Sequence, residues 1–75
     1  MTDQRIVDAL EAAGVDYDKE GFDQNRLFKD NGVDSLDVMS LFLALEEAYG
    51  VKFSEQDVSM IATPRELAEA LNRKL

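Results

Sequence analysis

The sequence predicts an all-α fold, a four-helix bundle with three main helices, a short third helix and a long first loop. Three observations predict it. The 75 residues, 45% of them hydrophobic, are enough for one small core, so we expect a single domain over residues 1–75. Apolar residues recur at helical spacing in segments that open on capping residues. Strand signals are weak, and the best of them, residues 50–53, is too short.

The first helix is predicted over residues 3–13. Thr2 is the expected N-cap, and Gly14 is expected to end the helix. The apolar residues that recur at helical spacing are Ile6, Val7, Ala9, Leu10 and Ala13.

A long connection follows over residues 14–34. It is rich in Gly, Asn and Asp, which form turns and caps, so we expect a loop without regular structure. Scattered apolar residues are expected to hold this loop against the core: Val15, Tyr17, Phe22, Leu27, Phe28 and Val33.

The second helix is predicted over residues 35–49. Asp34 is its expected N-cap, Asp37 lies in its first turn, and Gly50 follows its last residue. Both acidic side chains suit the positive end of the helix dipole.

The third and fourth helices open on capping-box patterns. Ser54 and Asp57 predict a short helix over residues 55–61. Thr63-Pro64-Arg65-Glu66 combines an N-cap, a proline at the first position and the capping-box Glu of the last helix. The expected apolar stripe of the last helix is Leu67, Ala70, Leu71 and Leu75.

The second helix carries two apolar faces when its residues are placed about 100° apart. One broad stripe is assigned to the core: Val38, Leu41, Phe42, Leu45 and Tyr49. The opposite face holds Leu36, Met39 and Leu43, with Ser40, Glu46 and Glu47 among them. Because a domain of this size buries one stripe of a helix well, we expect the second face to be exposed, as in a docking surface. The alternative is a central helix that is buried on all sides.

Charge gathers around the same helix. The chain has 16 acidic and 8 basic residues, a net charge of −8. Residues 30–51 hold five acidic residues and no basic one, so they carry −5 of that total. Charge gathered in this way steers a basic partner, although a merely solubilising face is the simpler alternative.

The composition excludes several classes of function. Without His or Cys, the chain cannot form Ser-His-Asp or Cys-His relays or disulfides, and carboxylates alone disfavour a zinc site. The negative charge disfavours binding to nucleic acids and anionic membranes. We therefore expect a protein that is not an enzyme, that is monomeric and that binds no metal. Charged residues near the N-terminus are incompatible with a signal peptide, so a cytoplasmic location is expected.

Gly32-Val33-Asp34-Ser35-Leu36-Asp37, followed by Ala44-Leu45-Glu46-Glu47, resembles the acyl carrier proteins. The resemblance covers essentially the whole chain, including the long loop and the short third helix. It implies that Ser35 is the attachment point for 4′-phosphopantetheine, which a carrier-protein synthase transfers from coenzyme A. The arm would hold acyl groups as thioesters and present them to enzymes of fatty-acid, lipid or polyketide synthesis.

The resemblance also assigns the residues around Ser35. The residues implied to face partner enzymes, which would have basic docking faces, are Asp34, Leu36, Asp37, Met39, Leu43, Glu46 and Glu47. The residues implied to line an acyl cavity are Val38, Leu41, Phe42, Leu45 and Ile61. Two departures from fatty-acid carriers, Ser40 in place of Glu and the large Phe42, leave a specialised carrier open. A peptidyl carrier or an unmodified acidic interaction module would also be compatible with the sequence.

Two weaker patterns point to different functions. Asp16, Asp18, Glu20 and Gly21 match the opening of a calcium-binding EF-hand loop, but the match fails at Asp23 and Leu27. The Gly-Val-Asp-Ser-Leu segment differs by an inserted Val from the Gly-Asp-Ser-Leu hydrolase motif, and the chain lacks the His that such a hydrolase needs.

Overall fold

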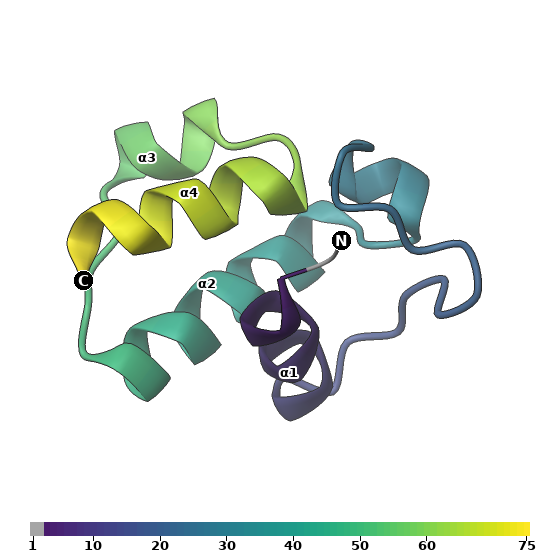
Figure 1. Ribbon diagram of the computed structural model, residues 1–75, viewed down its shortest axis with the longest axis horizontal. Coiled ribbons are helices and arrows are strands. Elements are labelled where there is room, and N and C mark those ends of the chain that lie inside the picture. Colours follow the sequence, from purple (N-terminus) through teal and green to yellow (C-terminus); the bar gives the residue numbers. More distant parts are fainter. Residues whose placement is uncertain (1–2) are drawn as a thin grey trace.

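A computed structural model describes residues 3–75, and within this range every regular element is a helix. The elements are α1 (Gln4–Ala12), the 3-10 helix η1 (Phe28–Asn31), α2 (Ser35–Tyr49), α3 (Glu55–Met60) and α4 (Pro64–Lys74). Helix α1 packs against both α2 and α4. The connection between α1 and α2 lies at the end of the molecule where α2 begins (Figure 1). The prediction of an all-α bundle with a long first loop is confirmed.

The predicted N-caps of α2, α3 and α4 are confirmed by their hydrogen bonds. The side chains of Asp34, Ser54 and Thr63 each accept a hydrogen bond from the backbone N–H three residues further on. Each bond satisfies one of the N–H groups that the first turn of a helix leaves without a partner. In α3 and α4 the reciprocal bond completes the capping box.

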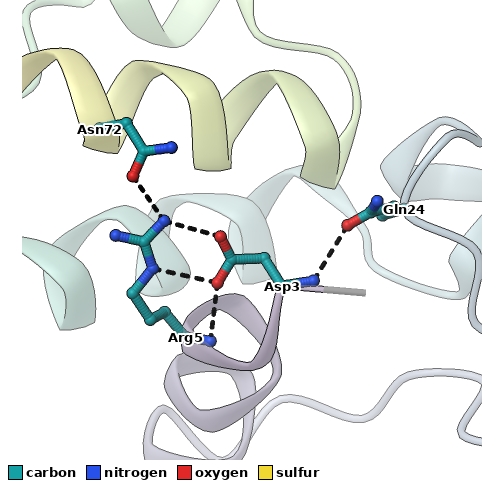
Figure 2. Close-up of polar contacts among 4 residues, drawn as sticks. All are labelled: Asp3, Arg5, Gln24 and Asn72. Carbon is teal, nitrogen blue, oxygen red and sulfur yellow. Dashed lines mark hydrogen bonds and ion pairs between the residues drawn. The ribbon is translucent and has the colours of Figure 1, made fainter. Parts of the chain in front are cut away.

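The N-cap of α1 is Asp3, so the prediction for α1 was wrong by one residue; Thr2 lies outside the described residues. Asp3 Oδ1 accepts from the backbone N–H of Arg5 at 3.0 Å, and the Arg5 guanidinium pairs with Asp3 Oδ2 at 2.7 Å. Figure 2 shows the same guanidinium reaching Asn72 of α4, while the Asp3 N–H donates to Gln24 of the loop. The hydrogen bonds from Arg5 hold the pKa of Asp3 below its usual value. This cluster ties the start of α1 to α4 and to the loop.

The core is formed by the inner faces of α1, α2 and α4 and by apolar residues of the loop. Its most deeply buried members are Ile6, Leu10, Val33, Leu41, Leu45, Leu67 and Leu71. Tyr49, Leu75 and Leu27 are exposed, contrary to their predicted core roles. Tyr49 and Leu75 lie at or just after the last turn of their helices, and Leu27 lies just before η1.

The long loop contains one element that the sequence did not predict, the 3-10 helix η1. It is held by contacts from distant segments, since Phe28 N–H donates to the carbonyl of Ala62 at 3.0 Å. Its last residue, Asn31, is completely buried. Asn31 Oδ1 accepts from the Asp23 N–H, and Nδ2 donates to the carbonyls of Asp23, Arg26 and Leu27. One buried amide therefore fixes the course of the loop that leads to α2.

Asp57 links α3 to the end of α4. Its carboxylate accepts from the backbone N–H of Ser54 at 3.0 Å and pairs with Lys74 Nζ at 3.1 Å. The hydrogen bond from Ser54, with a further contribution from Lys74, lowers the pKa of Asp57.

We expect Asp57→Asn to melt at a lower temperature than the parent chain at pH 7. In acid, this difference in melting temperature should disappear. The folded-state pKa lies below that of the unfolded chain. The ionised carboxylate therefore stabilises the fold above the ordinary Asp pKa of about 3.9. This contribution disappears as the pH falls through the folded-state pKa. Thermal unfolding from pH 7 to pH 2.5 measures it, with the exposed Asp16→Asn as a control of equal charge change. A difference between Asp57→Asn and the parent chain that is independent of pH would contradict the assignment.

Candidate functional site

Ser35 is the first residue of α2, and its side chain is exposed. The preceding residue, Asp34, caps the helix, because Asp34 Oδ1 accepts from the Asp37 N–H at 2.9 Å. Within residues 3–75 the Ser35 hydroxyl has no hydrogen-bond partner, so its role is not that of an N-cap. The local structure leaves a free hydroxyl at the N-terminus of a 15-residue helix, where the dipole favours a phosphate group.

Ser35 is one of the residues that line an apolar groove of about 370 Å³. Its lining residues come from η1, from the segment between η1 and α2, from the first turns of α2, and from α3 with the segment that follows it: Phe28, Lys29, Val33, Ser35, Val38, Met39, Val58, Ile61 and Ala62. The structure thus brings Val38 and Ile61 of the predicted cavity together beside Ser35. Leu41, Phe42 and Leu45 are instead buried in the core and do not line this groove.

The groove includes residues that sequence reasoning missed. Phe28 and Val33 lie close together before α2, whereas Val58 lies on α3 and meets them only in the fold. Lys29, on η1, supplies a basic side chain to a wall that also contains Ser35. No periodicity signal links η1 to α3, because the contact between Phe28 and Ala62 is tertiary.

The second apolar face of α2 is exposed, as predicted. Leu36, Met39 and Leu43 are 78%, 48% and 58% exposed, which contradicts the alternative of a helix buried on all sides. Asp34 and Glu47 are exposed beside them, and Asp37 is half-buried.

Glu46 has a structural partner outside its own helix, unlike Asp34, which caps α2 itself. Its Oε2 accepts from the backbone N–H of Phe53 at 2.8 Å, and the side chain is half-buried. The segment that connects α2 to α3 is therefore held by a carboxylate from the predicted docking face. The Ser40 hydroxyl lies 3.4 Å from the Leu36 carbonyl, within the helix.

Phe42 and Phe53 form an aromatic pair. Their ring centroids are 4.9 Å apart and the rings are nearly perpendicular, at 76°. Lys74 Nζ lies 5.4 Å from the centre of the Phe53 ring. The pair joins α2 to the segment before α3.

The segment that resembles an EF-hand forms a local turn, in which Asp18 Oδ1 accepts from the Gly21 N–H at 2.9 Å. Over residues 3–75, no three acidic side chains are gathered in a way that could hold a metal ion. In the same range, no helix is both long enough and apolar enough to cross a membrane.

The chain matches the family model of the phosphopantetheine attachment site over residues 5–71. It is 32% identical over 65 residues to an acyl carrier protein of Bdellovibrio bacteriovorus, and the match covers 87% of this chain and 82% of that protein.

Solved structures show the same fold. The hexanoyl acyl carrier protein of the actinorhodin polyketide synthase from Streptomyces coelicolor is 31% identical, with a TM-score of 0.83 over 100% of this chain and 91% of that one. An acyl carrier protein from Thermotoga maritima is 27% identical, with a TM-score of 0.76 over 95% of this chain and 81% of that one.

The fold and the site together define a small helical carrier domain for a covalently attached prosthetic group. The chain belongs to the acyl carrier protein family. Members of this family carry acyl groups on 4′-phosphopantetheine and interact with phosphopantetheinyl transferases and acyl-processing enzymes. The local chemistry fits this group, because a free hydroxyl at a helix N-terminus lies beside an apolar groove.

Proposed function

We propose that Ser35 is the residue that carries 4′-phosphopantetheine and that the whole chain acts as one carrier domain without catalytic activity of its own. The observation that carries this proposal is the free, exposed Ser35 hydroxyl in the lining of the apolar groove. When bound, the arm supplies the thiol that holds an acyl group as a thioester. The chain has no cysteine, so no thiol of its own competes for acyl groups.

The residues around Ser35 have different roles in this proposal. Val38, Val58 and Ile61 offer apolar surface to an acyl chain that enters the groove. Lys29 offers a positive charge on the groove wall, which favours an anionic group nearby. Asp34 and Asp37 repel a phosphate, so their role is recognition by a basic modifying enzyme.

The exposed face of α2 is the docking surface for partner enzymes in this proposal. Leu36, Met39 and Leu43 provide apolar contact, while Glu46, Glu47, Asp34 and Asp37 attract a basic face. The cytoplasm, where acyl coenzyme A donors occur, is the proposed location.

The proposed cargo is an acyl or polyketide intermediate. The similarity to carriers from a polyketide synthase favours a specialised pathway, as do Ser40 and Phe42 at positions where fatty-acid carriers differ.

Incubation with coenzyme A and carrier-protein synthases tests whether Ser35 carries the arm. We expect one phosphopantetheine adduct by intact mass, which peptide mapping assigns to Ser35. The absence of an adduct with several synthases would favour the unmodified interaction module.

Charge reversal at Glu47 is expected to slow docking without weakening the fold. Glu47→Lys places a positive charge on the docking face, so association with a carrier-protein synthase should slow several-fold at low salt and depend less on ionic strength. Stopped-flow association rates at several salt concentrations measure both effects.

Glu69→Lys is the matched control, because it makes the same charge change on α4. Glu46→Lys is a poorer test, since it also removes the hydrogen bond from the Phe53 N–H. If Glu47→Lys and Glu69→Lys have equal effects, only net charge matters and the docking face is misassigned.

A further inference from the structure

Phe42 and Phe53 do not themselves line the apolar groove, but Phe42 follows the groove residue Val38 along α2. Val38 lines the groove, and Phe42 lies four residues later on the same face of the helix, about 6 Å further along its axis. Phe42 is only 2% exposed, and its ring contacts the Phe53 ring edge to face. An acyl chain that runs inward from Ser35 past Val38 would therefore meet two aromatic rings.

Phe53 is held in place by contacts from two helices, α2 and α4. Its N–H donates to Glu46 Oε2 of α2, and its ring lies beneath the Lys74 ammonium of α4. Lys74 also pairs with Asp57 of α3. A ring that is fixed by a backbone hydrogen bond, an aromatic contact and a cation contact yields less readily than an aliphatic side chain.

We propose that Phe42 and Phe53 close the inner end of the groove and so limit the length of the acyl chain that the protein can shelter. This inference rests on the proposed function of Ser35 and adds a specificity determinant to it. The carrier would bury short acyl chains and leave the ends of longer ones in water. The chemical class of cargo that it protects is then a short acyl group rather than a long fatty acyl group.

Thermal stability as a function of acyl length tests the inference. Arms with acyl chains of increasing length are attached to Ser35 from acyl coenzyme A donors, and intact mass confirms each product. Each methylene that becomes fully buried should raise the melting temperature by up to about 3 to 6 °C, and methylenes left in water should add nothing. Phe42→Val makes the side chain smaller by roughly four carbons. We therefore expect the gain to stop at a chain length roughly two to four carbons shorter in the parent chain than in Phe42→Val.

Phe22→Val is the matched control. Phe22 is half-buried and forms the other edge-to-face pair, with Tyr17 of the loop, at 5.6 Å. This variant should lower all melting temperatures but leave the limiting chain length unchanged. Phe53→Leu opens the barrier from the opposite side. If Phe42→Val does not fold, Phe53→Leu replaces it in the same measurement.

The outcomes separate the two proposals. Suppose that all three proteins form normal adducts on Ser35 and that the limiting acyl length is the same in the parent, Phe42→Val and Phe53→Leu. This result would overturn only the proposed barrier of Phe42 and Phe53. An equal change in limiting length in Phe22→Val would also overturn it. If no adduct forms on the parent chain, the assignment of Ser35 fails, and the barrier fails with it.

Discussion

Ser35→Ala is expected to abolish attachment of the phosphopantetheine arm and, with it, all acyl carriage. The substitution removes the only atom of residue 35 that can form the phosphodiester. Since Asp34 provides the N-cap of α2 and the Ser35 hydroxyl has no partner among residues 3–75, the fold should survive. We expect complete loss of the adduct by intact mass and a melting temperature within about 3 °C of the unmodified parent.

Ser40→Ala is the matched control for this prediction. Ser40 lies on the same helix and is also exposed, but it does not line the groove. It should accept the arm at the rate of the parent. An adduct that persists in Ser35→Ala, or one that is lost in Ser40→Ala, would show that the attachment residue is misassigned.

Asn31→Ala is expected to cost the fold about 2 to 4 kcal/mol. The substitution leaves the Asp23 N–H and three backbone carbonyls without the amide that now joins them. A chain of 75 residues has a total stability of roughly 4 to 11 kcal/mol, so this loss is a large fraction of it. Urea denaturation followed by circular dichroism measures the change as a shift of the midpoint.

Asn25→Ala provides the comparison for Asn31, because it removes the same side chain from an exposed position in the same loop. Asn25 Oδ1 accepts a single side-chain bond, from Arg65 at 3.2 Å, and its loss should cost less than about 0.5 kcal/mol. If the two variants are equally stable, the hydrogen bonds of Asn31 do not hold the loop.

The sequence predicted the features of this fold that depend on local chemistry. Asp34, Ser54 and Thr63 are side chains that favour helix starts wherever they occur, and each caps the helix expected of it. The exposed second face of α2 followed from helical periodicity together with the size of the domain. Ser35 was found by resemblance, since a serine before an apolar helix is otherwise an ordinary capping residue.

The parts that could not be predicted depend on contacts between distant segments. Asn31 has the character of a turn residue in the sequence, and only the folded loop shows it buried. Glu46 fits the charged face by its position in the helix, but its bond to the Phe53 N–H follows from where the next segment lies. The groove beside Ser35 combines η1 with α3, two elements without a common sequence pattern, so its walls were only partly predicted.

The two apolar faces of α2 have a consequence for sequence variation. On α4, one side packs into the core while Arg65, Glu66 and Glu69 face water, so substitutions should be tolerated on one side and rejected on the other. On α2, packing constrains the inner side, and under the proposed function partner enzymes also constrain the outer side. A saturation mutagenesis screen for stability alone would find that α2, like α4, tolerates substitutions on its outer side and rejects them on its inner side. The same screen for acyl transfer would find almost every position of α2 restricted.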